Sequence, residues 1–203
     1  MKLLLASNNE KKRAELLRIL AGFGLEPVTP REAGIALDPD ENGDTFAANA
    51  RSKALAFSAA TALPVLADDS GLEVDALGGA PGVRSARFAG AHGDDAANRR
   101  KLLEALATTP AERRGGRFVC ALCLAQDRRI LAEVESDCRG RMLTAERGAG
   151  GFGYDPLFLH EPSGRTFAEL DATEKDAVSH RGRALRALVP HLPHLAAAKG
   201  RSS

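Results

Sequence analysis

The chain has 203 residues, of which 44% are hydrophobic and 27% are charged. This apolar content can form the core of one globular domain, or of two lobes that share a sheet, and it excludes a disordered tail, a collagen-like rod and a disulfide scaffold. The 28 Lys and Arg residues nearly balance the 27 Asp and Glu residues, which leaves a net charge of +1. No overall field therefore directs the chain to a nucleic acid polymer or a charged membrane.

Cysteine content and hydropathy indicate the cellular setting. Three cysteines are too few for a disulfide framework, which favours a reducing environment. No stretch approaches the roughly 20 apolar residues that a membrane-spanning helix needs. We therefore expect a cytoplasmic protein with no membrane partner.

The first third of the chain alternates predicted strands and helices. Residues 2–6 form a short apolar run, and apolar residues then recur at helical spacing until Gly22. A second, Ala-rich helix is predicted from about residue 45 to residue 62. Residues 63–67 indicate a buried strand that ends in Asp68-Asp69. This order is typical of strand-to-helix units.

The rest of the chain adds an antiparallel hairpin. A helix is predicted at 98–107, and residues 118–125 and 130–138 flank a polar turn, as the two strands of a hairpin do. A short apolar piece at 156–159 precedes a helix predicted from about residue 174 to residue 188. The combination favours one α/β domain with a mixed sheet.

The first strand-to-helix junction is a candidate phosphate site. Unpaired backbone N–H groups, the positive end of the helix dipole and two lysines meet there. An ordinary helix cap with solvated lysines is the alternative. The residues at this junction are Ser7, Asn8, Asn9, Glu10, Lys11 and Lys12.

Two groups of carboxylates are candidates for a metal or for acid–base chemistry. The loop Asp38–Asp44 can supply oxygen ligands to Mg²⁺, although such a loop taken alone is more often a solvated turn. Asp68 and Asp69 follow a buried strand and point to opposite faces, so one of them can activate water or bind metal while the other anchors the loop. Burying a carboxylate costs solvation free energy unless the group is paired or bound to a metal, and this cost favours a functional role for Asp68 and Asp69.

A glycine cluster at 148–153 contains the pattern G-x-G-x-x-G. A dinucleotide-binding fold needs a helix directly after the last glycine, but Pro156 and an apolar run follow, so we reject that interpretation. A loop that presents Phe152, Tyr154 and Asp155 fits better, with an aromatic face for a base and a carboxylate for its hydrogen-bonding edge.

Cys120-x-x-Cys123 is not expected to bind zinc or form a disulfide, because residues three apart on a strand face opposite sides. Lys175 and the segment Ser179-His180-Arg181 are candidate site residues only if they face the same cleft as the loops above. No Walker-type phosphate loop occurs.

Taken together and in order, these segments resemble the inosine/xanthosine triphosphate pyrophosphatase family over nearly the whole chain. Six motifs in register are specific, whereas any one could arise by chance. The matching motifs are Ser7-x-Asn9-x-x-Lys12, Thr45-Phe46 with Asn49-Ala50-x-x-Lys53, Ala67–Leu72, Gly78–Gly82 with Ser85–Gly90, Gly151–Pro156, and Glu174-Lys175 with Ser179-His180-Arg181.

The resemblance implies a single domain over residues 1–203, with an elongated mixed β-sheet flanked by helices, two lobes with the active-site cleft between them, and a homodimer. It also implies Mg²⁺-dependent hydrolysis of ITP, dITP and XTP to the monophosphate and pyrophosphate. Asp69 is then the expected base, although whether Asp68 or Asp69 serves stays open, as does the choice between Asp40 and Glu41 as a metal ligand beside Asp69. The implied substrate-binding residues are Ser7, Asn8, Asn9, Glu10, Lys11, Lys12, Lys53, Ser70, Phe152, Gly153, Tyr154, Asp155, Lys175, His180 and Arg181.

Base choice has a physical explanation. A 6-oxo purine presents an acceptor at C6 where adenine presents a donor, so a donor from His180-Arg181 would pair with the first and be left unpaired by the second. Guanine shares the 6-oxo group, so its rejection would be decided near C2, by backbone groups or Asp155. Phe152 is predicted to stack on the base.

Two other functions are open. A Maf-like pyrophosphatase for modified pyrimidine nucleotides is a related enzyme, but the Phe152–Asp155 loop and Ser179-His180-Arg181 are evidence against it. A non-catalytic nucleotide- or RNA-binding module fits the arginine content. The near-zero net charge and Asp68-Asp69 are evidence against that alternative.

Overall fold

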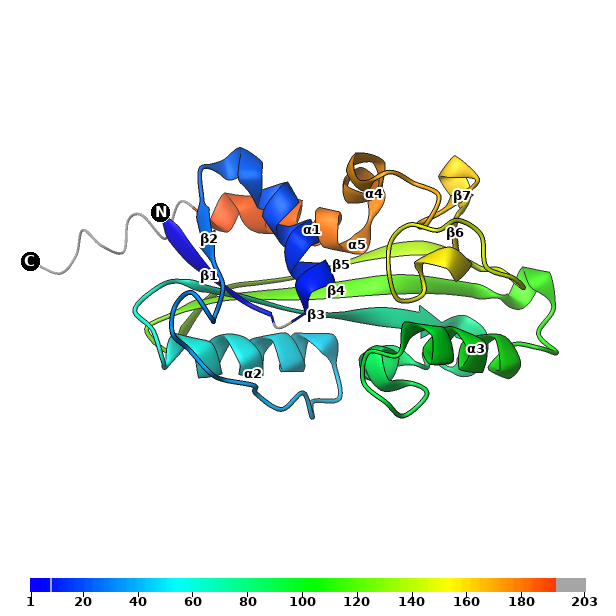
Figure 1. The fold of residues 1–203 in the computed structure, drawn as a ribbon, viewed down its shortest axis with the longest axis horizontal. Helices are drawn as coiled ribbons and strands as arrows, with labels where there is room; N and C mark the ends of the chain where they lie inside the picture. The colour runs from blue at the N-terminus through cyan, green and yellow to red at the C-terminus, as the bar shows by residue number, and fades with distance from the viewer. Residues whose placement is uncertain (8, 193–203) are drawn as a thin grey trace, which may run out of the picture. The chain divides into compact units, whose positions relative to one another are not determined.

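A computed structural model describes residues 1–7 and 9–192 (Figure 1). Seven strands form one sheet in the order β2-β1-β3-β4-β5-β6-β7. β1 pairs in parallel with β2 and β3, whereas β6 pairs antiparallel with β5 and β7, so the predicted α/β class with a mixed sheet flanked by helices is confirmed. The strands are β1 Lys2–Ala6, β2 Glu26–Val28, β3 Val65–Val74, β4 Gly115–Gln126, β5 Arg129–Met142, β6 Phe158–His160 and β7 Arg165–Thr166; the helices are α1 Glu10–Leu20, α2 Phe46–Ser58, α3 Asp95–Ala105, α4 Ala172–Val178 and α5 His180–Leu188.

The chain divides into two compact units. Unit 1 comprises Met1–Asp69, Cys120–Ser136 and the chain from Arg181 onward, and unit 2 comprises Ser70–Val119 and Asp137–His180. Strands β3, β4 and β5 each contribute residues to both units. The elongated two-lobed form and its cleft stay predictions.

In unit 1, the sheet is covered on both faces. Leu3, Leu4, Leu5 and Ala6 of β1 are all fully buried, although neighbouring side chains point to opposite faces. α1 and α5 pack on one face through Leu16, Leu20, Ala184, Leu185 and Leu188, while α2 covers the other face (Figure 1). A strand buried on both sides needs a continuous apolar sequence, which explains the run at residues 3–6.

In unit 2, α3 packs on the sheet through Leu102 and Leu106, which join a cluster with Leu72 and Val74 of β3. Aromatic residues supply much of the remaining core. Phe118 lies 4.7 Å from Phe158 and 5.6 Å from Phe167, measured between ring centroids. Most of the chain's few aromatic rings are therefore structural.

Two predicted boundaries in unit 1 were wrong. The second helix ends at Ser58 rather than near residue 62, because Thr61 accepts a hydrogen bond from the Leu63 N–H and Pro64 disfavours helix before it. The strand predicted at 63–67 runs from Val65 to Val74, so it does not end at Asp68 and Asp69. Buried Leu72 and Val74 continue its apolar pattern.

The hairpin prediction is confirmed, with strands longer than expected. Asp127 and Arg128 at its turn have φ values of 50° and 61°, the left-handed pair that a two-residue hairpin turn requires. The helix predicted at 98–107 is α3, which begins at Asp95 because Asp94 caps it by accepting from the Ala97 N–H.

The helix predicted from 174 to 188 is in fact two helices. α4 begins at Ala172, after the capping box of Asp171 and Glu174, and Ser179 is extended with ψ 158°, which separates α4 from α5. Among the described helices, none is both long and apolar enough to cross a membrane.

Candidate active site

The end of β1 brings the candidate residues of unit 1 together. The parallel pairing of β1 with β3 ends at Ala6 opposite Ala67. Ser7 then leaves the sheet toward α1, while β3 continues through Asp68 and Asp69. Polar side chains are therefore concentrated where β1 ends at its carboxyl edge, the usual place for a ligand in an α/β sheet.

Asp68 is held among three cations. Its side chain is only 1% exposed. Its Oδ2 lies 3.8 Å from Lys12 Nζ and 3.9 Å from Arg181 Nη2, and its main-chain oxygen accepts from Lys53 Nζ at 3.0 Å. Burial raises the pKa of Asp68, but the charges of Lys12, Arg181 and Lys53 together outweigh it and hold this pKa below its usual value. Asp68 is therefore a stable anion and a poor candidate for a base.

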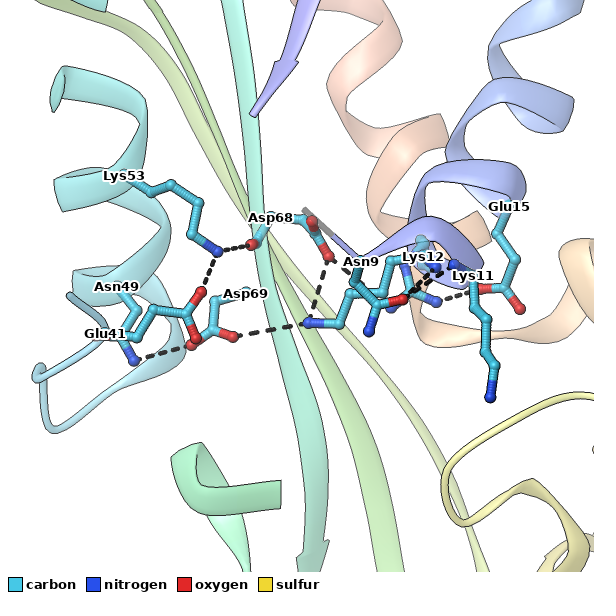
Figure 2. A network of polar contacts seen from close by, with 10 residues as sticks. Asn9, Lys11, Lys12, Glu15, Glu41, Asn49, Lys53, Asp68 and Asp69 are labelled. Atoms are coloured by element: carbon cyan, nitrogen blue, oxygen red, sulfur yellow. Dashed lines mark hydrogen bonds and ion pairs between the residues drawn. The ribbon is translucent and has the colours of Figure 1, made fainter. Parts of the chain in front are cut away.

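Asp69 has the opposite electrostatic environment. Its Oδ2 accepts from Asn49 Nδ2 of α2 at 2.9 Å, and its Oδ1 lies 3.9 Å from Lys12 Nζ (Figure 2). Burial raises the pKa of Asp69, and the neighbouring charge of Glu41 adds to the rise, against the opposing effects of Lys12 and Asn49. A raised pKa suits a group that must accept a proton.

The acidic loop reaches this cluster through Glu41. Glu41 forms an ion pair with Lys53, and the loop is held by the Gly43 N–H, which donates to Asn49 Oδ1 at 2.8 Å. Burial lowers the pKa of Lys53, but Asp68 and Glu41 outweigh burial, so this pKa is raised and Lys53 stays charged. Asp40, the other candidate in the loop, is exposed to solvent.

The N-terminus of α1 supplies one lysine to the cluster. Asn9 caps the helix, and its Oδ1 accepts from the N–H groups of Lys11 and Lys12 at 3.0 Å each. Lys12 lies between the two aspartates, whereas Lys11 is directed away from them (Figure 2). Ser7 is buried and Glu10 is exposed at the first position of the helix. The predicted residue Asn8 lies outside the described residues.

Two residues of this cluster were not predicted from the sequence as site residues. Asn49 connects the acidic loop to Asp69, and Glu15 pairs with the buried guanidinium of Arg181. Both stand one helical turn from a predicted lysine, Asn49 four residues before Lys53 and Glu15 three residues after Lys12. This helical spacing places each pair on one helix face and is the signal that could have identified both.

Arg181 belongs to this cluster, in unit 1, whereas His180 belongs to unit 2. The Arg181 side chain is 2% exposed. Burial lowers its pKa, but the charges of Glu15 and Asp68 and the hydrogen bond to Glu15 are among the effects that together outweigh burial and raise this pKa. His180 instead stacks on Phe118, with 4.8 Å between ring centroids. The sequence treated these neighbours as one donor segment, yet their side chains have separate environments.

A metal site made of protein groups alone is not present in the described part of the chain, where no three His, Cys, Asp or Glu side chains are arranged to hold an ion. Glu41 and Asp69 nevertheless fit Mg²⁺. The charge of Glu41 adds to the effect of burial in raising the pKa of Asp69, and a bound cation would offset this repulsion. Mg²⁺ commonly binds one or two carboxylates together with substrate phosphates.

In unit 2, the glycine loop forms a second cluster. Asp155, 3% exposed, accepts from Lys175 Nζ at 2.6 Å and from the Phe152 N–H at 2.8 Å. Lys175 Nζ lies 4.8 Å from the centroid of the half-buried Phe152 ring. Lys175 thus contacts the residues predicted to bind a base, and a short 3-10 turn at Asp155–Leu157 replaces the helix of a dinucleotide fold.

The other predicted residues of unit 2 have clear positions. Tyr154 is buried and its hydroxyl donates to the Ser85 carbonyl at 2.9 Å, while burial raises its pKa. Gly153 has φ +60°, which favours glycine, and Ser70 is half-buried within β3. Outside both clusters, Cys120 and Cys123 are buried and free, as predicted, and burial raises the pKa of each to about 12.

Comparisons with known proteins agree with the motifs. The chain is 51% identical over 188 residues to a dITP/XTP pyrophosphatase of Gloeobacter violaceus, covering 92% of each chain. It is 50% identical over 198 residues to a dITP/XTP pyrophosphatase of Mycobacterium tuberculosis, covering 96% of this chain and 97% of the other. A solved structure of a HAM1 protein from Coxiella burnetii has a TM-score of 0.85 and 39% identity, with 96% of this chain and 99% of that one covered.

The family model for the Ham1 family matches residues 3–191, which is nearly the whole chain. The family resemblance seen in the six motifs is confirmed by this match and by the named relatives. On these grounds the chain belongs to the Ham1 family.

Proposed function

We propose that the protein hydrolyses non-standard purine nucleoside triphosphates, namely ITP, dITP and XTP, to the monophosphate and pyrophosphate, and so removes them from the nucleotide pool. The observation that carries the proposal is the cluster of Asp69, Glu41, Lys12 and Lys53 in a chain about 50% identical to enzymes named dITP/XTP pyrophosphatase. A charged, largely buried cluster of this kind suits a triphosphate, because opposing charges interact strongly away from water.

Asp69 is the proposed base. It would accept a proton from the water that attacks the α-phosphorus, as the bond between the α-phosphorus and the bridging oxygen breaks and pyrophosphate leaves. Its pKa, raised by burial and by Glu41, favours this role, whereas Asp68 is held ionised by three cations and would instead position Lys12 and Lys53. These lysines would offset the negative charge that develops on the leaving group.

The main groups for the triphosphate are thus Lys12 and Lys53. The N-terminus of α1, from Ser7 to Lys12, would add backbone N–H groups and its helix dipole. These are the donors that phosphate oxygens need.

Mg²⁺ is the proposed metal, held by Glu41 and Asp69 together with the substrate. It would supply positive charge that neutralises the phosphates. A carboxylate bound directly to a metal is a weaker base. If Glu41 were the main protein ligand of Mg²⁺, Asp69 would remain the stronger base and could accept the proton. Asp40, which is exposed, is the less favoured ligand of the two loop candidates.

The glycine loop of unit 2 is the proposed site for the base. Phe152 would stack on the purine, and His180 would be the donor to its 6-oxo group, since Arg181 is engaged with Glu15. Asp155 is paired with Lys175, which leaves Lys175 as a further donor for the purine edge rather than a phosphate ligand. Glycine residues permit the close approach of the loop to a flat base.

We further propose that the enzyme is a cytoplasmic homodimer that does not bind nucleic acid polymers. The near-zero net charge supports the lack of binding to nucleic acid polymers, the free, buried cysteines support the location, and the family resemblance supports the dimer. Light scattering after gel filtration should give a mass near twice that of one chain. A monomeric mass would contradict the dimer.

A substrate panel tests the proposed function directly. Purified protein with Mg²⁺ should release pyrophosphate from ITP, dITP and XTP much faster than from ATP or GTP. Equal rates on all five, or release of orthophosphate, would contradict it. Modified pyrimidine triphosphates in the same panel test the Maf-like alternative.

A further inference from the structure

Two side chains of α3 hold the glycine loop from outside it. The Gly153 N–H donates to Asp95 Oδ2 at 3.0 Å, and Arg99 Nη1 donates to the Gly153 carbonyl at 3.0 Å. Asp95 and Arg99 are four residues apart, so they lie on one face of the helix. Arg99 is itself oriented by Glu146, which accepts from its Nε at 2.8 Å.

This contact fixes the backbone of a glycine in the loop. Gly153 has φ +60°, and a glycine can leave this conformation at little cost. Its N–H and its carbonyl belong to the two peptide groups that flank its α-carbon. Bonds to both groups therefore set the direction in which the chain enters and leaves Gly153.

The conformation of Gly153 affects the residues next to it in the sequence. Phe152 immediately precedes Gly153, and its N–H is bonded to Asp155 at 2.8 Å. A rotation at Gly153 would therefore move the Phe152 ring and strain the pairing of Asp155 with Lys175. Because the bonds of Asp95 and Arg99 to Gly153 act on the glycine loop, we expect their effect on the base rather than on phosphate chemistry.

We propose that Asp95 and Arg99 are positioning residues for base recognition: they hold Gly153 so that Phe152 and Asp155 meet the purine in one orientation. The proposal rests on the proposed function, because it assigns the glycine loop to the base. It extends the site to α3, a helix to which neither the motifs nor the relatives' names assign a role.

Calorimetry in the presence of Mg²⁺ can measure the binding of two ligands, and the comparison distinguishes this positioning role from a general structural one. IMP carries the base, whereas pyrophosphate carries only phosphates. We expect Asp95→Ala and Arg99→Ala each to weaken IMP binding about tenfold, the equivalent of one lost hydrogen bond, and to leave pyrophosphate binding unchanged. Asp95→Asn keeps an oxygen acceptor for the Gly153 N–H and should restore most of the IMP affinity.

The control variants use the same helix. Arg100→Ala removes an exposed charge next to Arg99 and should leave both affinities unchanged. Asp95→Asn and Asp95→Ala lose the same favourable charge at the helix N-terminus, so a difference between them reports on the bond to Gly153. If Asp95→Ala does not fold, Arg99→Ala provides the test by itself.

Unchanged IMP affinity in the folded alanine variants would overturn the proposal, and so would an equal loss for IMP and pyrophosphate. If the wild-type protein cleaves ITP and binds both ligands, but the variants do not lose IMP affinity selectively, this inference alone is overturned. A wild-type protein that binds pyrophosphate but not IMP would overturn the proposed base site and this inference with it.

Discussion

The two clusters differ in the interactions that they offer to a ligand. The cluster of unit 1 consists of buried charged side chains, with Asp68 and Asp69 separated from Lys12 by 3.8–3.9 Å. The loop of unit 2 offers one ring and a series of backbone hydrogen bonds around Gly153. Charges act over several ångströms, whereas stacking and edge recognition depend on close contact.

Because of this difference, the two clusters require different degrees of structural precision from the fold. A phosphate cluster tolerates small movements of its lysines, because the attraction falls slowly with distance. A base site loses its selectivity when a donor moves by a fraction of its bond length. The loop of unit 2 is accordingly tied at successive peptide groups, while the lysines of unit 1 are held mainly by ion pairs.

The largest effect is expected where chemistry takes place, at Asp69. Asp69→Asn keeps the hydrogen bond from Asn49 but cannot accept a proton, so kcat for ITP should fall about 10³-fold. Pyrophosphate release measures kcat, and urea unfolding checks that the fold persists. Asp44→Asn, at an exposed position of the same unit, is the control and should be fully active. A kcat within tenfold of wild type would remove Asp69 from the mechanism.

The second-largest effect is expected on stability, from loss of the negative charge of Asp68. Asp68→Asn removes the negative charge beside Lys12 and Arg181 but keeps the main-chain bond from Lys53, so the free energy of unfolding should fall by about 3 kcal/mol at pH 7. Because the pKa of Asp68 is lowered in the folded state, its ionisation stabilises the fold above the unfolded pKa. That stabilisation is lost as pH falls through the folded pKa.

The stability gap between the two proteins should therefore begin to narrow as pH falls below about 4, and it should close only below the folded pKa of Asp68. Urea unfolding in Mg²⁺-free buffer, at pH 7 and again at acid pH, measures the difference. A stability gap that does not change with pH would contradict the electrostatic explanation and indicate a packing defect instead.

The sequence predicted the charged cluster better than the loop. Asp69, Lys12 and Lys53 were identified because strand ends and helix starts place polar residues at a sheet edge, and the family resemblance joined them. The choice between Asp68 and Asp69 needed the structure, since it depends on which cations lie nearby. Asn49 and Glu15 were not predicted as site residues because both lie within helices rather than at a strand end or a helix start.

The fold was predicted at the level of class and element order, and its errors have local causes. β3 continued beyond Asp69 because Leu72 and Val74 are buried by elements distant in sequence. The break at Ser179 carries no glycine or proline, and the serine that directly precedes α5 is only a weak local signal for a new helix start. The two hydrogen bonds between α3 and Gly153 join residues 58 and 54 positions apart, so no local pattern in the sequence predicts them.

A smaller effect distinguishes the two acidic candidates for the metal. Glu41→Gln removes a carboxylate beside Asp69 and should raise the Mg²⁺ concentration for half-maximal activity about tenfold. Asp40→Asn, one residue earlier and exposed, should leave it unchanged. Activity measured over a Mg²⁺ series gives both values. Equal shifts in the two variants would mean that the loop acts only through its total charge.

The smallest effect is expected at the ring of the glycine loop. Base stacking on an aromatic side chain contributes about 1–3 kcal/mol, and Phe152 already contacts Lys175, so Phe152→Ala should raise KM for ITP about tenfold and leave kcat nearly unchanged. Phe152→Tyr keeps the ring and should behave like wild type. Because stacking needs only a flat face, XTP and ITP should be affected equally. An unchanged KM in Phe152→Ala would show that the ring has a structural role, and the contrast between the clusters would then rest on hydrogen bonds alone.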